Sequence, residues 1–281
     1  MAITRGATTS SFSTSAVSAV ADISHTVDSG TTLLVITACY EADENITATP
    51  SWSQGGGENF TLVHATTASG SASNTRNYVY ALVNPTSGAG TVSIANDAAA
   101  RTIFSSAVNY LGTNTVSVAA ATNFLSEDVN DAGTNTCVHA SAGSAGSALF
   151  FCGSLKTGAG GGLSSNDAAF NELFEGRTGT SGSSDQTYYI ADLLDSAPSA
   201  ITVTFPTTAS NAGNYIEIIA ASAAEPVFDV GGGVEFTLPL ATLSAGGSTD
   251  IDNTQGSGSR TFSMQLTRRN FGKSRKRGGF R

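Results

Sequence analysis

The chain has 281 residues, of which 40% are apolar and 12% are charged, and its formal net charge is -9. This apolar content excludes a disordered chain, which needs low hydrophobicity as well as polar composition. The 31 glycines and the small number of Lys, Arg and Met favour short strands joined by loops over a helical bundle. No apolar run reaches the ~18 residues that a membrane-spanning helix requires, so such a helix is excluded.

Short apolar runs with a period of two recur along the chain and predict β-strands. They are rich in β-branched and aromatic residues and are separated by Gly, Asn, Ser and Pro. In chain order, the predicted strands are 32–40, 76–83, 91–95, 102–111, 147–155, 187–194, 200–205 and 214–222. The segment SSNDAAFNELFEG (164–176) instead has the apolar spacing of a short helix, with Asn166 or Asp167 as its cap.

Four of the predicted strands repeat in the same order. LVITACY (34–40) matches 149–155 at an offset near 115, and NYVYALV, TVSI and ARTIFSSAV find counterparts at offsets of 110, 111 and 113. Two such halves, each with one apolar face, bury these faces against each other or exchange strands. We therefore predict an all-β fold over residues 1–225, a two-sheet antiparallel, jelly-roll-like β-sandwich of two related halves.

The composition changes after Pro226, where we place the domain boundary. Residues 226–281 are predicted to form a C-terminal extension with extended or hairpin segments at 227–243 and 260–266, separated by a flexible Gly/Ser/Asp-rich loop. Charge is segregated along the chain. Residues 260–281 hold eight of the 13 Lys and Arg and none of the 22 Asp and Glu, which leaves a net charge of -17 on residues 1–259. The two parts are therefore expected to face different surroundings.

The last 15 residues are Gly-rich and cationic, without apolar periodicity, and we call them the basic arm. Nucleic acid, an anionic membrane and an acidic protein surface would each attract such a segment. The acidic body weighs against the first two. An acidic protein stays favoured if the arm enters a groove or lies beneath a neighbouring subunit, where Arg pairs bidentately with carboxylates while the body projects into water. The predicted partner-binding residues are Arg268, Arg269, Phe271, Lys273, Arg275, Lys276, Arg277, Phe280 and Arg281.

The sequence lacks the GxSxG, HExxH and GxxxxGK[ST] motifs, and we predict neither enzymatic activity nor a cofactor. The three histidines are scattered, which is typical of loop or strand-edge positions, and the three cysteines lack a CxxC pair, which favours buried free thiols. These residues are His25, His64 and His139, and Cys39, Cys137 and Cys152.

Two kinds of binding site stay open as alternatives. The acidic clusters EADEN (41–45), SEDVND (126–131) and DIDN (250–253) supply the oxygen ligands that Ca²⁺ takes, although solvated loop carboxylates are the favoured interpretation and none matches an EF-hand loop. Paired carboxylates also hydrolyse glycosides, but the sequence does not bring these clusters together. Aromatic residues in loops offer a platform for glycans, and a core anchor is the favoured role of the lone Trp. The glycan-binding candidates are Trp52, Phe60, Tyr110 and Phe124.

Three motifs carry a resemblance to a known family. SGTTLLVI (29–36), LVNPTSGAGTV (82–92) and AVNYLG (107–112) resemble glycine- and threonine-rich sandwich modules of tailed-bacteriophage structural proteins and bacterial surface proteins. The resemblance spans residues 12–224 and departs at SWSQGGGENFTLV (51–63), where the family has an aromatic residue and a Gly-Gly step. It implies a sandwich architecture and a virion or cell-surface setting, and the family has no catalytic residues to carry over.

Together these features predict a non-enzymatic structural protein of a tailed-phage-like virion, assembled in the host cytoplasm because no secretion signal is visible. A capsid decoration or cement role is favoured over a tail fibre, since the chain lacks heptads. Expected partners are the major capsid protein or other virion subunits, and further copies in a homo-oligomer. Two alternatives stay open: a tail-fibre or surface module that binds host glycans, and a jelly-roll capsid subunit whose tail holds the genome.

Overall fold

A computed structural model of the chain describes thirteen stretches of the first 222 residues and six short strands beyond them. The stretches are 2–13, 22–41, 46–66, 75–95, 103–130, 136–139, 144, 146–155, 164–165, 170–177, 187–196, 200–206 and 211–222. The chain divides into two compact units, Met1–Ala223 and Ala224–Arg281. Among the described residues, no helix has the length and apolar character needed to cross a membrane.

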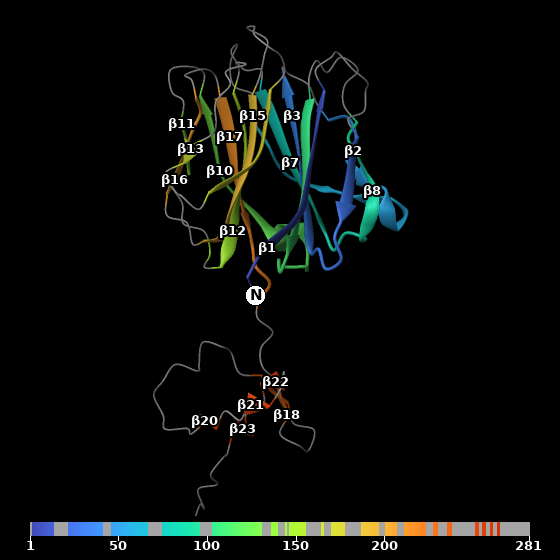
Figure 1. Cartoon of the computed structure of the whole chain (residues 1–281), viewed down its shortest axis with the longest axis vertical. Coiled ribbons are helices and arrows are strands. Elements are labelled where there is room, and N and C mark those ends of the chain that lie inside the picture. Colours follow the sequence, from blue (N-terminus) through green and yellow to red (C-terminus); the bar gives the residue numbers. More distant parts are fainter. Residues whose placement is uncertain are drawn as a thin grey trace, which may run out of the picture. The chain divides into compact units, whose positions relative to one another are not determined.

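Two five-stranded antiparallel sheets lie at the centre of the first unit (Figure 1). The first large sheet contains, in spatial order, β1 (Thr4–Ser13), β9 (Ile103–Leu111), β3 (Leu33–Glu41), β7 (Thr75–Val83) and β6 (Thr61–Ala65). The second large sheet contains β10 (Thr122–Asn130), β17 (Asn211–Ile218), β12 (Ser147–Leu155), β15 (Thr187–Ser196) and β14 (Asn171–Arg177). We call β1 to β9 the first half of the unit and β10 to β17 the second half.

Each half also has a small sheet. In the first half it contains β2 (Ile23–Val27), β8 (Gly88–Ser93), β4 (Ser51–Trp52) and β5 (Glu58–Asn59), with the 3-10 helix η1 (Gln54–Gly56) between the last two. In the second half it contains β11 (Thr136–His139), β16 (Ile201–Thr204) and β13 (Ser164–Ser165). A short helix, α1 (Val118–Ala121), connects the halves. Ser117 caps its N-terminus, and the Ser117 hydroxyl accepts a hydrogen bond from the Ala120 amide at 3.2 Å.

Three apolar cores separate the four sheets. Val35 of β3 and Phe150 of β12 lie in the central core, between the two large sheets. Their chain neighbours Ile36 and Phe151 point the opposite way, into the first and second outer cores, which lie between each large sheet and its small sheet. Because these central strands are buried on both faces, they are continuous apolar runs in the sequence.

The two halves share one topology. When the strands of each large sheet are counted along the chain, both sheets have the spatial order first, fifth, second, fourth, third. The order β1-β9-β3-β7-β6 of the first half thus corresponds to β10-β17-β12-β15-β14 in the second. The predicted all-β sandwich of two related halves is confirmed, and the apolar faces of the halves pack against each other in the central core as expected. Each half adds its small sheet on the far side of its large sheet, so the unit has four layers rather than the two sheets predicted.

The strand pairings show which residues of the halves are equivalent. Leu34 of β3 lies opposite Asn109 of β9, and Leu149 of β12 lies opposite Glu217 of β17. If Leu34 and Leu149 are equivalent, as the sequence match implies, Asn109 corresponds to Glu217 at an offset of 108. The sequence match gave an offset of 113 for this strand instead of 108. The two values differ by an odd number of residues, so the sequence match would assign the side chains of this strand to the wrong face of the sheet.

The helix expected over 164–176 is wrong for the residues that the structure describes. Asn171–Arg177 forms the edge strand β14, which pairs antiparallel with β15. Leu173 and Phe174 pack against the central core from this strand. The open edge of β15 offers backbone hydrogen bonds along the whole segment, and this pairing outweighs the local apolar spacing.

The second unit contains three short antiparallel pairs. Strand β18 (Val227–Asp229) pairs with β19 (Glu235–Thr237), in the region where a hairpin was expected. Strand β20 (Ile251–Asp252) pairs with β23 (Ser263–Met264), and β21 (Gln255–Gly256) pairs with β22 (Ser259–Arg260). Part of the segment expected to be a flexible loop, 244–259, therefore belongs to these pairs.

Candidate functional site

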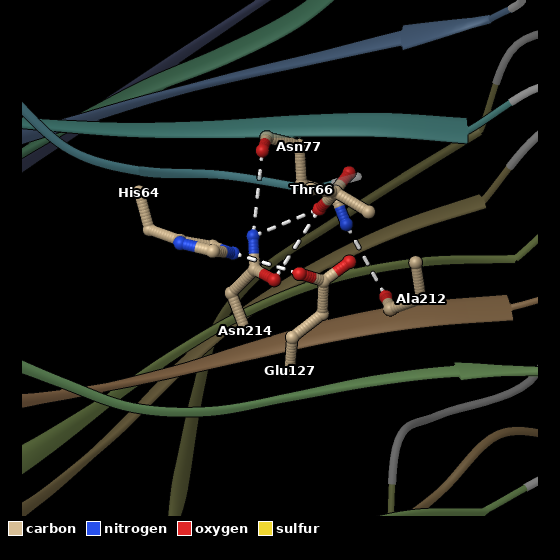
Figure 2. A network of polar contacts seen from close by, with 6 residues as sticks. All are labelled: His64, Thr66, Asn77, Glu127, Ala212 and Asn214. Atoms are coloured by element: carbon tan, nitrogen blue, oxygen red, sulfur yellow. Dashed lines mark hydrogen bonds and ion pairs between the residues drawn. The ribbon is translucent and has the colours of Figure 1, made fainter. Parts of the chain in front are cut away.

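A polar network crosses the central core and joins the two halves (Figure 2). Asn214 Nδ2 donates to Thr66 Oγ1 at 2.9 Å and to the Asn77 carbonyl at 3.3 Å. Asn77 Nδ2 donates to the Ala212 carbonyl at 3.2 Å, and Asn77 Oδ1 accepts from Ser154 Oγ at 2.8 Å. Buried amides cost free energy unless they are hydrogen-bonded, so this network favours one specific docking of the halves.

His64 and Glu127 lie beside this network and connect the edge strands β6 and β10 (Figure 2). His64 Nε2 is 2.9 Å from Glu127 Oε2. Phe124, also on β10, stacks on the imidazole with ring centroids 3.7 Å apart and an interplanar angle of 10°. His64 therefore covers one face of the Phe124 ring, which is 37% exposed.

The four aromatic residues considered for glycan binding do not share a surface. Trp52 is fully buried in the first outer core, where its Nε1 donates to the Thr86 carbonyl at 2.9 Å. Phe60 lies in the same core, and Tyr110 is fully buried in the central core. Phe124 is the exposed member of the four. A sugar has no access to the other three rings in the folded unit, and the core role weighed for Trp52 is the one observed.

A buried carboxylate joins the first strand of the chain to the second half. Asp192 of β15 is fully buried and forms an ion pair with Arg5 of β1. It also accepts a hydrogen bond from Tyr110 Oη at 3.0 Å. Burial raises the pKa of Asp192, and the attraction of Arg5 and the two hydrogen bonds oppose this rise.

The acidic clusters do not assemble a metal site in the described part of the chain, where no group of three or more potential metal ligands gathers. In SEDVND, Glu127 pairs with His64, and Asp128 Oδ2 accepts from the Val138 amide at 2.8 Å. Most of EADEN and half of DIDN lie outside the described residues.

All three cysteines are free and buried, as expected. Cys39 Sγ and Cys152 Sγ face each other across the central core at 3.6 Å. Burial raises the pKa of the Cys39 and Cys137 thiols well above the usual range. Because the thiolate is the reactive form, these thiols are poor nucleophiles.

A hydroxyl–imidazole–amide chain links the two sheets of the first half. His25 Nδ1 is 2.9 Å from Thr9 Oγ1, and His25 Nε2 is 2.9 Å from Asn109 Oδ1. Asn109 Nδ2 donates to Asp28 Oδ2 at 3.0 Å, and the same oxygen accepts from the Ala7 amide at 2.7 Å. The Asn109 oxygen is an acceptor, so His25 Nε2 carries a proton and donates to it. Burial lowers the pKa of His25, so at neutral pH the ring is uncharged and Nδ1 accepts from the Thr9 hydroxyl.

This chain borders an open hollow of about 550 Å³. The size is within the range of small-molecule sites, and the side chains around it are small and uncharged at neutral pH. The lining residues are Ala7, Thr9, Ser24, His25, Thr26, Ala89, Gly90 and Thr91. A hydroxyl, a base and an orienting amide are also the parts of a nucleophilic catalyst, but His25 is only 4% exposed, which limits access of a substrate to the base.

The same hydroxyl–imidazole contact recurs in the second half, where Ser126 Oγ is 3.1 Å from His139 Nδ1. The hydroxyl residues are at equivalent positions of β1 and β10. Thr9 lies opposite the residue two before Asn109, and Ser126 lies opposite the residue two before Glu217. Since Asn109 and Glu217 are equivalent, Thr9 and Ser126 are equivalent as well.

The two histidines also occupy equivalent positions, in β2 and β11. His25 lies opposite Gly90 of β8, and His139 lies opposite Ile201 of β16. Gly90 and Ile201 are separated by 111 residues, which is the offset at which TVSI matches TVTF. The contact thus recurs at equivalent positions of the two halves, because both of its members recur in register.

Sequence reasoning missed this pair because it treated the histidines as scattered. A usable signal was present, since His25 and His139 are 114 residues apart, within the range of offsets at which the strands repeat. All three histidines lie within strands, and His25 and His139 are buried.

The basic arm lies outside the described residues. This holds for all of its predicted binding residues: Arg268, Arg269, Phe271, Lys273, Arg275, Lys276, Arg277, Phe280 and Arg281. Comparisons with protein-family models, with curated proteins and with solved structures found no match to this chain. The family resemblance therefore stays a prediction from the quoted motifs.

Proposed function

We propose that this chain is a structural protein of a tailed-phage-like virion, held in the particle by its basic arm while its acidic body is displayed. The observation that carries the proposal is the segregation of charge. Residues 260–281 contain eight basic and no acidic residues, whereas residues 1–259 have a net charge of -17. A negatively charged surface attracts the arm and repels the body, so the arm binds and the body projects.

The architecture of the first unit, which holds 17 of the 22 acidic residues and most of the body, supports a display role. Its halves are joined by an apolar core, by the amide network around Asn77 and Asn214, and by the ion pair between Arg5 and Asp192. A body connected in these three ways keeps its shape when it is held by one end. Within the virion we place it as a decoration or cement protein on the major capsid protein or another acidic subunit.

The test uses particles from cells that produce this chain. In the arm variant, Gln replaces six basic residues: Arg268, Arg269, Lys273, Arg275, Lys276 and Arg277. We expect the unaltered chain to co-sediment with particles in a density gradient and the arm variant to remain in the unassembled fractions. Circular dichroism then checks that the arm variant retains its β-structure.

A matched control removes positive charge from the body instead. Arg101→Gln with Lys156→Gln leaves the arm intact, so this variant should enter particles as the unaltered chain does. Incorporation of the arm variant at the level of the unaltered chain would contradict the proposal.

A second experiment identifies the kind of surface that the arm binds. Full-length protein is applied to polyglutamate beads, to duplex DNA and to phosphatidylserine vesicles at about 0.15 M salt. We expect retention on polyglutamate that the arm variant loses. Preference for DNA, with affinity that falls steeply as salt rises, would contradict the proposal and favour a capsid subunit that binds the genome.

A further inference from the structure

We propose that the contact between Thr9 and His25 is an acid-sensitive lock between the two sheets of the first half. Thr9 belongs to β1, at the edge of the first large sheet, and His25 belongs to β2, at the edge of the small sheet. Asn109 of β9 holds the other imidazole nitrogen from the large sheet. The imidazole is therefore bound on both sides by the sheet that it faces.

The recurrence in the second half indicates that the contact has a mechanical role. His139 is fully buried and His25 nearly so, which leaves little access for a substrate in either half. The hydroxyl and the imidazole recur in register, whereas the position of Asn109 is taken by Glu217. What the halves share is thus a hydrogen bond from the large sheet to the small sheet.

Protonation of His25 would place a positive charge between the two sheets. In the neutral ring, Nδ1 accepts the hydroxyl proton of Thr9 and Nε2 donates to Asn109 Oδ1. In the cation both nitrogens are donors, so the Thr9 hydroxyl rotates and accepts from Nδ1, and this hydrogen bond is kept with its direction reversed. The cation is disfavoured because the side chain is 4% exposed, and the charge gains water only if the small sheet separates from the large sheet.

The charged surroundings only partly offset this cost. Asp28 favours the cation, but burial is the larger effect and lowers the pKa of His25 below its usual 6.5. Asp28 itself stays ionised, because the Ala7 amide and Asn109 lower its pKa. The other groups that the described elements pack against the ring carry no charge: Thr9 from β1, Gly90 from β8, Trp52 from β4 and Asn109 from β9.

The sign of the pH dependence follows from this shift. The folded pKa of His25 is below the unfolded value, so its contribution to stability is fully present above pH 6.5 and is lost as pH falls through the folded pKa. The open hollow beside Thr9 and His25 gives water and protons a route to the ring. Acidification should therefore loosen β2 from β1 before the whole unit unfolds.

Hydrogen exchange on the full-length chain tests the lock. Between about pH 7.5 and pH 5, exchange of the β2 amides, corrected for the intrinsic rate, should rise about threefold or more, while β15 stays protected. Thr9→Val keeps the shape of the side chain and removes the hydroxyl. It should give faster β2 exchange already at the higher pH, because the hydrogen bond from β1 to the ring is lost.

Ser126→Ala is the matched control, because it removes the equivalent hydroxyl in the second half and should leave the acid response of β2 unchanged. Should Thr9→Val fail to fold, an NMR titration of the His25 ring in the unaltered chain decides instead. The lock predicts a neutral ring protonated on Nε2 at about pH 7, with a folded pKa below the unfolded value. A charged ring at that pH, or β2 exchange that does not respond to acid, overturns the proposal.

Discussion

At the scale of single residues, several buried polar groups lie in partnered sets that join segments distant in sequence. Asp192 illustrates the balance of energies. Its burial opposes ionisation, while Arg5 and Tyr110 supply a charge and a hydrogen bond that favour it. A buried ion pair of this kind adds little net stability, but removing one partner leaves the other groups without a buried acceptor.

Substitutions of Asp192 should separate these effects. Asp192→Asn keeps an oxygen acceptor for Tyr110 and removes the cost of burying a charge, so we expect a change in unfolding free energy of less than about 1 kcal/mol. Asp192→Ala leaves Arg5 and Tyr110 without their acceptor and should cost about 2–4 kcal/mol. Urea unfolding at neutral pH measures both.

The pH dependence of Asp192 has a defined sign. Its folded pKa is raised, so its contribution to stability is greatest below the unfolded pKa and is lost as pH rises through the folded pKa. The unaltered chain should therefore lose stability relative to Asp192→Asn between about pH 4 and neutral pH. A gain over the same interval would contradict the assignment.

At the scale of elements, the outer cores of the two halves differ in which of two neighbouring positions holds the larger residue. A Cβ atom on Gly90 of β8 would lie 2.7 Å from Trp52 Cη2 and 2.8 Å from Ser53 Oγ, both on the neighbouring segment. The strand pairings place Ile201 at the position equivalent to Gly90 and Ser165 at the position equivalent to Trp52. One half thus combines a large residue with glycine, and the other combines a small residue with isoleucine.

Gly90→Ala should destabilise the first half by about 1–3 kcal/mol, because the fully buried Trp52 ring cannot move away from the added methyl. In a Trp52→Phe background, where Cη2 is absent, the same substitution should cost less. A double-mutant cycle by urea unfolding measures this coupling, and additive costs would show that the two positions do not compete for space.

The elements also show why the sequence predicted some strands and missed others. The predicted strand 147–155 coincides with β12 (Ser147–Leu155), because both of its faces are buried and most of the segment is apolar. The edge strand β1 (Thr4–Ser13) is rich in Thr and Ser and pairs on one side, so it lacks an apolar pattern. Strand β2 (Ile23–Val27) alternates buried and exposed residues, but a histidine occupies one buried position and weakens the signal.

At the scale of the whole molecule, the central core makes each half depend on the other. The inner face of each large sheet presents apolar side chains along its length, and these are buried only when the halves pack together. The connection between the halves passes Val116, which is 84% exposed, so the chain can be divided there with little loss of packing. The two halves are thus expected to behave as complementary fragments.

Residues 1–116 and 117–223, produced separately, should each aggregate or self-associate, because an apolar sheet face would be exposed to water. Produced together, they should form a one-to-one complex with the β-structure of the intact unit. Size-exclusion chromatography with light scattering distinguishes these cases. Separate fragments that remain monomeric and folded would contradict the dependence.

The sequence by itself determined the fold class, the duplication and the segregation of charge. Alternating apolar residues and turn residues are local properties, and the duplication is visible as strand matches at offsets of 110 to 115 residues. The net charge of each part requires no knowledge of the fold. These features are therefore readable before the chain is folded.

Only the tertiary structure decided how the halves stack and what the polar residues do. Four layers arise because side chains on both faces of the central strands need a partner sheet, and a run of apolar letters does not say which sheet covers which face. In the structure, Trp52 and Tyr110 are core residues, and Asn171–Arg177 is a strand. Asn214 donates a hydrogen bond to the Asn77 carbonyl across the central core. Each outcome depends on contacts between residues far apart in the chain, which compete with and outweigh local preference.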